Sequence, residues 1–216
     1  MPVSELHREI AAIALRAAAR HGFALAGGNA LLAYEFVARE TEDVDLFTNV
    51  ESGVEVAAGA VEAALRRAGF TAQRQDAAAG LAEWIVTAPD GRQTMLQLSY
   101  FDREHEPVHM DLGPVPGLPV LDLPVLDLED LIGQKVCALA SRIEVRDYID
   151  TAQALRRYTA RELIGLARRR DAGLEERDFA EAGRELDRLT DAQFAQYGLT
   201  PDDVARIRDA FAAWPR

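Results

Sequence analysis

The sequence predicts a mixed α/β (α+β) fold: a small sheet with flanking helices, followed by an all-helical C-terminal domain. Helical and strand patterns alternate over the first half of the chain, whereas only helical patterns occur after residue 126. A proline-rich stretch, 113–126, separates the two regions and has the composition of an irregular connector. We therefore expect a core domain at 1–112, the connector at 113–126 and a helical domain at 127–216, in a chain of 216 residues.

The elements of the first region follow from periodicity and from turn residues. Apolar residues recur at helical spacing in the first helix, a short apolar run ends at two glycines, and Gly69 is a C-cap signal. The turn Pro89-Asp90-Gly91 joins two alternating segments as a hairpin. The predicted elements are helices at 4–21, 29–38 and 54–68, and strands at 23–26, 44–48, 70–75, 82–88 and 93–101.

The second region shows only the helical spacing of apolar residues. It predicts helices at about 127–142, 145–157, 160–170, 175–189 and 201–213.

Composition indicates a soluble, cytoplasmic protein. No stretch approaches the roughly 18 apolar residues that cross a bilayer, so we expect no membrane contact. The start of the chain lacks the pattern of a signal peptide. Cys137 is the only cysteine, which excludes an intrachain disulfide and suits a reducing compartment.

The net charge of −12 argues against a protein whose whole surface grips nucleic acid. The acidity is N-terminal: residues 1–130 carry 9 basic and 21 acidic residues, whereas residues 131–170 carry 9 basic and 4 acidic. The basic segment 131–170 is either a surface for a polyphosphate or an RNA backbone, or an ordinary solvated helix face.

Gly27 and Gly28 lie between a predicted buried strand and a helix. Glycines there allow a positive φ and a close approach of backbone to a ligand, and the helix start is an anion site in principle. The alternative is a simple tight turn.

Asp43 and Asp45 are two residues apart on a predicted strand, so both side chains point to one face. Two carboxylates this close favour a hard cation between them, and Mg²⁺ is the leading candidate. Val44 and Leu46 point to the opposite, buried face, which favours a packed strand over a solvated turn. Arg39 and the nearby Thr41 add donors suited to phosphate oxygens.

Lys135 is the only lysine, against 23 arginines. It falls in the middle of the apolar stripe of its predicted helix, where an unpaired ammonium would be costly. We therefore expect it to meet a carboxylate, a phosphate or both; a lysine that reaches the surface at the edge of the stripe is the alternative. Asp147 and Asp150 follow at helical spacing, as partners of Lys135, as a general base, or as a structural ion pair.

The four histidines suggest no zinc site. His105 and His109 flank Pro107 and cannot share a helix face. We assign no role to His7 or His21.

These motifs resemble a known family. The segments 27–31 (Gly-Gly-Asn-Ala-Leu) and 39–47, which contains Asp43-Val44-Asp45, look like the signature of AbiEii/AbiGii-type nucleotidyltransferase toxins of the DNA polymerase β-like superfamily. Lys135 followed by Arg146-Asp147-Tyr148-Ile149-Asp150 resembles the family's later motif. The resemblance covers roughly residues 20–155.

The resemblance implies a toxin of a toxin–antitoxin system that transfers a nucleotide from an NTP to an acceptor, in several members the 3′ end of tRNA. It implies Mg²⁺, with Mn²⁺ as a substitute, and a cognate antitoxin as partner. Asp43 and Asp45 would hold the metal.

The remaining roles are implied in the same way. Gly27 and Gly28, with Asn29, would bind the triphosphate, and Lys135 would contact phosphate. Asp147 or Asp150 would position or deprotonate the acceptor, so that the helical domain contributes to the site.

The chain departs from the superfamily pattern at one point. A third metal-binding carboxylate is expected on a neighbouring strand, where this chain has Gln97 and Ser99 and no acid before Asp102. Asn29 also stands where a threonine is expected. We therefore expect one firmly held metal, with a second one arriving with the nucleotide.

Two other functions remain open. One is a nucleotidyltransferase that modifies a protein or a small molecule. The other is a catalytically weak binding or antitoxin module of the same fold.

Overall fold

The computed structural model of the chain describes residues 3–37, 39–115 and 122–216. Contacts divide the chain into two compact units, Met1–Leu128 and Glu129–Arg216. We call them the sheet unit and the helical unit and describe each by itself. This is the mixed α/β architecture with a helical C-terminal part that the sequence predicts.

The sheet unit contains one seven-stranded mixed sheet over its described residues, in the order β3-β4-β5-β2-β1-β7-β6. Its strands are β1 (Ala24–Leu25), β2 (Asp43–Thr48), β3 (Thr71–Ala78), β4 (Leu81–Thr87), β5 (Gln93–Tyr100), β6 (Val108–Asp111) and β7 (Asp122–Val125). The central strand β2 runs parallel to β5 and antiparallel to β1.

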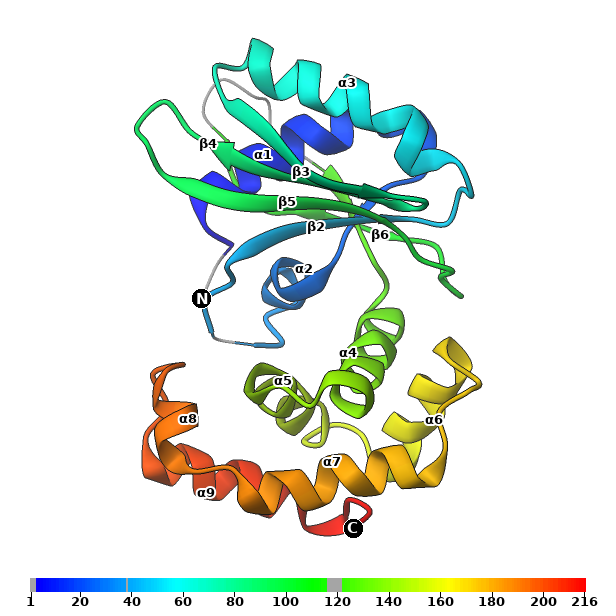
Figure 1. The fold of residues 1–216 in the computed structure, drawn as a ribbon, viewed down its shortest axis with the longest axis vertical. Helices are drawn as coiled ribbons and strands as arrows, with labels where there is room; N and C mark the ends of the chain where they lie inside the picture. The colour runs from blue at the N-terminus through cyan, green and yellow to red at the C-terminus, as the bar shows by residue number, and fades with distance from the viewer. Residues whose placement is uncertain (1–2, 38, 116–121) are drawn as a thin grey trace. The chain divides into compact units, whose positions relative to one another are not determined.

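Three helices cover this sheet. They are α1 (Glu5–Ala17), α2 (Gly27–Ala33) and α3 (Gly53–Arg67). A short 3₁₀ turn, η1 (Ala19–His21), follows α1. Helices α1 and α3 pack together on one face, and α2 lies on the other (Figure 1). The core between α1, α3 and the sheet is apolar: Ile10, Val61 and Leu65 are fully buried, as are Val44 and Leu46 of β2.

The helical unit consists of α4 (Leu128–Arg142), α5 (Val145–Ala154), α6 (Ala160–Arg170), α7 (Glu176–Arg188), α8 (Asp191–Ala195), α9 (Pro201–Ala210) and the turn η2 (Phe211–Ala213) (Figure 1). Its core is aromatic. The Tyr148 hydroxyl donates to the Ala182 carbonyl (2.7 Å), and the Trp214 indole donates to the Phe179 carbonyl (3.0 Å). Each bond satisfies the polar group of a buried aromatic side chain.

The structure corrects the expected connector. Residues 122–125, taken as irregular, form β7, which pairs antiparallel with β6 and parallel with β1 through Leu25 and Val125. Residues 116–121 of the connector lie outside the described residues. A strand in this segment escapes a periodicity search because it is four residues long and contains Pro124.

Smaller differences concern element ends and short elements. Helix α2 begins at Gly27 itself and ends at Ala33, earlier than the predicted 29–38. Strand β6 and the five-residue α8 were not predicted. No helix in the described part of the chain is both long and apolar enough to cross a membrane.

Candidate active site

The centre of the candidate site in the sheet unit is the contact between Gly27 and Asp45. Gly27 has φ of 59°, and a Cβ built on it would overlap Asp45 Oδ2 and stand 2.7 Å from Asp45 Cγ. The Ala26 amide donates to the Asp45 carbonyl (2.8 Å), which locks the turn before α2 onto β2. Only glycine fits at position 27, because the carboxylate occupies the side-chain space.

Gly28 is packed in the same way against the residues before β2. A Cβ on Gly28 would overlap Thr41 Cγ2, and Arg39 Nη2 would lie 3.7 Å from it. In the sequence, Arg39 and Thr41 lie more than ten positions after the two glycines. The structure brings them together, so the two glycines, Arg39 and Thr41 line one turn.

Asn29 is 1% exposed and does not point to solvent. Its Nδ2 donates to the Asp43 carbonyl (2.7 Å), and its Oδ1 accepts from the Thr41 hydroxyl (2.9 Å). This side chain therefore holds the strand that carries Asp43.

Asp43 and Asp45 lie on the face of β2 opposite the buried Val44 and Leu46, and both are partly exposed. Two carboxylates on the same strand face, with a glycine turn packed against one of them, form an oxygen-rich set. Such a set fits a hard divalent cation such as Mg²⁺.

The neighbouring strands add a carboxylate that sequence reasoning missed. Gln97 of β5 pairs in register with Asp45 on one side and with Glu83 of β4 on the other. Gln97 Nε2 donates to Glu83 Oε1 (2.8 Å). A carboxylate can only accept, so Gln97 turns its amide nitrogen toward Glu83. The strand register, which the sequence does not reveal, places Glu83 beside Gln97 and in line with Asp45.

In the helical unit, Lys135 of α4 pairs with Asp150 of α5. The distance from Nζ to Oδ2 is 3.3 Å, and the two side chains are 13% and 0% exposed. The lysine therefore meets a carboxylate, one of the partners that its place in the apolar stripe requires.

Asp147 is held by a different cation. Arg142 donates to it through Nε (2.9 Å) and Nη2 (2.8 Å), a bidentate pair with a fully buried carboxylate. The hydrogen bonds from Arg142 to this carboxylate raise the pKa of Arg142 above its ordinary value. Both oxygens of Asp147 are thus engaged across the α4–α5 corner, whereas Asp150 faces the lysine.

Most cations of the basic segment 131–170 are neutralised within the helical unit. Besides Lys135 and Arg142, the paired residues are Arg146 with Glu144 (2.7 Å), Arg168 with Glu176 (3.1 Å), Arg169 with Glu129 (3.3 Å) and Arg170 with Asp130 (3.1 Å). At least six of the nine basic residues therefore have an acidic partner. Three exposed arginines lie around the turn between α5 and α6: Arg156, Arg157 and Arg161.

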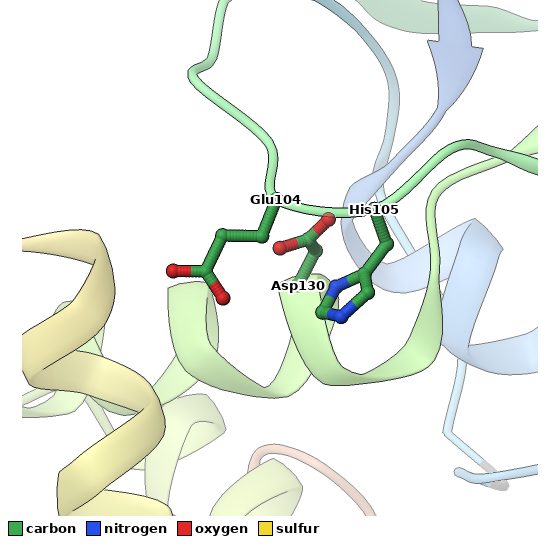
Figure 2. Close-up of side chains that lie close together, drawn as sticks. All are labelled: Glu104, His105 and Asp130. Carbon is green, nitrogen blue, oxygen red and sulfur yellow. The ribbon is translucent and has the colours of Figure 1, made fainter.

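Other acidic and histidine side chains are a weaker metal set. Glu104 and His105 lie on the segment between β5 and β6 (Figure 2), and His105 Nδ1 is 3.6 Å from Asp127 Oδ1. Asp130, drawn in the same view, lies in the first turn of α4 and is paired there with Arg170. A donor set that includes an imidazole suits a hard cation less well than the two carboxylates Asp43 and Asp45 do.

Comparison with known proteins decides the family. The model of the nucleotidyl transferase AbiEii toxin of type IV toxin–antitoxin systems matches residues 10–213. The chain belongs to this AbiEii toxin family. It is therefore a toxin-type nucleotidyltransferase, an enzyme for which the family implies an NTP substrate and an antitoxin partner.

Solved structures share the fold of this AbiEii-family protein. MenT4, a nucleotidyltransferase toxin from Mycobacterium tuberculosis H37Rv, is 16% identical with a TM-score of 0.65, over 96% of this chain and 86% of that one. JHP933 from Helicobacter pylori is 17% identical with a TM-score of 0.55, over 96% and 91%. No curated protein sequence matches significantly.

Proposed function

We propose that this AbiEii-family enzyme uses Mg²⁺ to transfer nucleotides from an NTP to an RNA acceptor such as the 3′ end of tRNA. The observation that carries the proposal is the packing of Gly27 against the Asp45 carboxylate. It brings the glycine turn, which can approach a triphosphate closely, against one of two carboxylates that share a strand face.

Asp43 and Asp45 are the proposed metal ligands, and Mn²⁺ would substitute for Mg²⁺ at oxygen donors. Bound there, the metal would offset the charge of the triphosphate and favour ionisation of the acceptor hydroxyl. The side-chain space at Gly27 and Gly28 is taken by Asp45 and Thr41, so phosphate oxygens would meet the backbone of this turn, and Arg39 beside it would supply donors.

We propose that Lys135 contacts phosphate and that Asp150 holds its ammonium. An ammonium has three donors, and the contact to Asp150 occupies one of them. Asp147 is the weaker candidate for positioning or deprotonating the acceptor, because Arg142 occupies both of its oxygens.

The choice of RNA as acceptor rests on the exposed arginines Arg156, Arg157 and Arg161. Their exposed guanidinium groups would meet a phosphate backbone. If they bind RNA, replacing Arg156 and Arg161 by alanine raises the KM for RNA and weakens its salt dependence, while the KM for NTP stays unchanged.

The deciding test is a transfer assay with each α-labelled NTP, Mg²⁺, and total RNA or total protein. We expect label in a tRNA-sized band with wild type and none with the Asp43→Ala/Asp45→Ala double variant. The matched control is Asp202→Ala/Asp209→Ala, which removes the same charge from exposed positions on α9.

Two other outcomes identify the alternatives. Label in protein or in a small molecule assigns a different acceptor class. No label from folded wild-type protein overturns the proposal and favours a binding or antitoxin module.

A further inference from the structure

A buried network of polar side chains surrounds His7 in the first turn of α1. His7 is 7% exposed. Its Nδ1 lies 3.2 Å from both Asn29 Oδ1 and Thr41 Oγ1, and its Nε2 lies 3.1 Å from Thr94 Oγ1. These partners belong to α2, to the approach to β2, and to β5. One imidazole therefore joins four parts of the sheet unit.

Two of these partners continue to the backbone at the start of β2. Asn29 Nδ2 donates to the Asp43 carbonyl (2.7 Å), and Thr94 Oγ1 donates to the Glu42 carbonyl (2.8 Å). Two consecutive carbonyls, next to the first proposed metal ligand, are thus held by the side chains that His7 contacts. Their direction fixes the peptide planes on both sides of the Asp43 Cα atom.

The imidazole of His7 can hold neighbouring side chains in fixed orientations because it is neutral and has a single N–H donor. Burial lowers the pKa of His7, while the hydrogen bond with Asn29 and the charge of Asp43 act in the opposite direction. A neutral imidazole has one N–H and one acceptor nitrogen. The nitrogen that carries the proton decides how the hydroxyls of Thr41 and Thr94 donate, so the network acts as one unit.

We propose that His7 is a positioning residue for the carboxylate strand: through Asn29 and Thr94 it sets the backbone of Glu42 and Asp43, and with it the direction of the Asp43 carboxylate. The proposal rests on the proposed metal-binding role of Asp43. His7 itself is buried and would act through these neighbours. Its effect resembles that of the outer groups that orient metal ligands in other sites.

The test compares three substitutions that remove different parts of the network. His7→Leu removes both polar ends, His7→Asn keeps an amide near Nδ1, and His7→Gln keeps one near Nε2. Leu65→Ala, in the fully buried part of α3, is the control for loss of stability alone. For each variant, the thermal midpoint, the affinity for Mn²⁺ alone, and kcat and KM for NTP are measured.

We expect His7→Leu to weaken Mn²⁺ binding by about 10–100-fold and to lower kcat by a similar factor. The KM for NTP changes less, since the groups beside the glycine turn remain. His7→Asn recovers part of the Mn²⁺ affinity through Asn29. Leu65→Ala lowers the thermal midpoint but binds Mn²⁺ like wild type at temperatures well below that midpoint.

Wild-type Mn²⁺ affinity in folded His7→Leu overturns the proposal, as does an equal loss of affinity in Leu65→Ala. If His7→Leu does not fold, the asparagine and glutamine variants carry the comparison: positioning requires that at least one of them weaken Mn²⁺ binding.

The two proposals fail separately. A wild-type protein that transfers no nucleotide, yet binds Mn²⁺ through Asp43 and loses it on His7→Leu, removes the proposed function and supports the positioning role. Absence of Mn²⁺ binding in wild type overturns the positioning role, whatever the transfer assay shows.

Discussion

The carboxylate of Asp45 fills the space that a side chain at position 27 would need. Gly27 has a positive φ of 59°, and a Cβ built on it would stand 2.7 Å from Asp45 Cγ and overlap Oδ2. The neighbouring Ala26 amide donates a hydrogen bond to the Asp45 carbonyl, so the turn before α2 and strand β2 are tied together. The glycine motif and the aspartate motif, 18 positions apart in the sequence, therefore form a single steric unit.

Replacing Gly27 by alanine should abolish most activity. The added methyl group must displace Asp45 or the turn, and alanine is strained at a φ of 59°. We expect a fall in kcat of at least about 100-fold, together with a loss of stability of about 1–3 kcal/mol. Initial rates of nucleotide transfer and a urea titration measure the two effects.

Gly59→Ala is the matched control for this substitution. Gly59 lies within α3, and a Cβ there meets nothing within 4 Å. Alanine should raise stability by up to about 1 kcal/mol without changing activity. Full activity in Gly27→Ala would show that Asp45 does not need its present position.

Asp147 and Asp150 should respond differently to the loss of charge. Asp147→Asn breaks the bidentate pair with Arg142 and should cost about 3 kcal/mol of stability, with activity per folded molecule largely kept. Asp150→Asn leaves Lys135 without its anionic partner and should lower kcat by about 100-fold with a smaller loss of stability.

A double-mutant cycle checks whether Asp147 contributes to stability through its pair with Arg142. Arg142→Gln combined with Asp147→Asn should cost less than the sum of the single substitutions, because the two residues share one interaction. Additive losses, or a larger fall in kcat for Asp147→Asn than for Asp150→Asn, would reverse the assignment of roles.

The sequence predicts the motif-bearing elements well because they depend on local signals. Strand β2 follows from the alternation of Asp43, Val44, Asp45 and Leu46, and α4 follows from an apolar stripe of helical period. Strands β6 and β7 were missed because they are short and depend on pairing between distant segments. The contact of β1 with β7 is a single register pair, Leu25 with Val125.

The supporting residues were harder to predict than the motif residues. His7 received no role, although it lies at helical spacing with the buried Ile10, Ala11 and Ala14. That spacing was the signal of its burial, but its partners come from three distant segments. Glu83 was missed for the same reason, since only the register of β4 against β5 brings it to Gln97.

Lys135 should not be replaceable by arginine. Its ammonium reaches Asp150 from a side chain that is only 13% exposed, and a broader planar guanidinium would meet the same carboxylate in a different geometry. We expect Lys135→Arg to lower kcat/KM for NTP by at least about 10-fold, and Lys135→Met to lower it further. Activity near wild type in the arginine variant would mean that a positive charge alone suffices.

Stability should fall in mild acid because of His7. Burial lowers the pKa of His7 below its ordinary value of 6.5, so near and below that pH the unfolded chain binds a proton that the folded protein resists. The contribution of His7 is therefore complete above about pH 7 and decreases as the pH falls through 6.5 toward the folded pKa.

The groups that face the ring from neighbouring elements are the uncharged Asn29, Thr41 and Thr94, with Asp43 as the nearby charge. Thermal midpoints at about pH 7.5 and 5.5 should differ more for wild type than for His7→Gln, which has no titrating group at this position. Equal differences in the two proteins would show that His7 does not titrate differently in the folded and unfolded states.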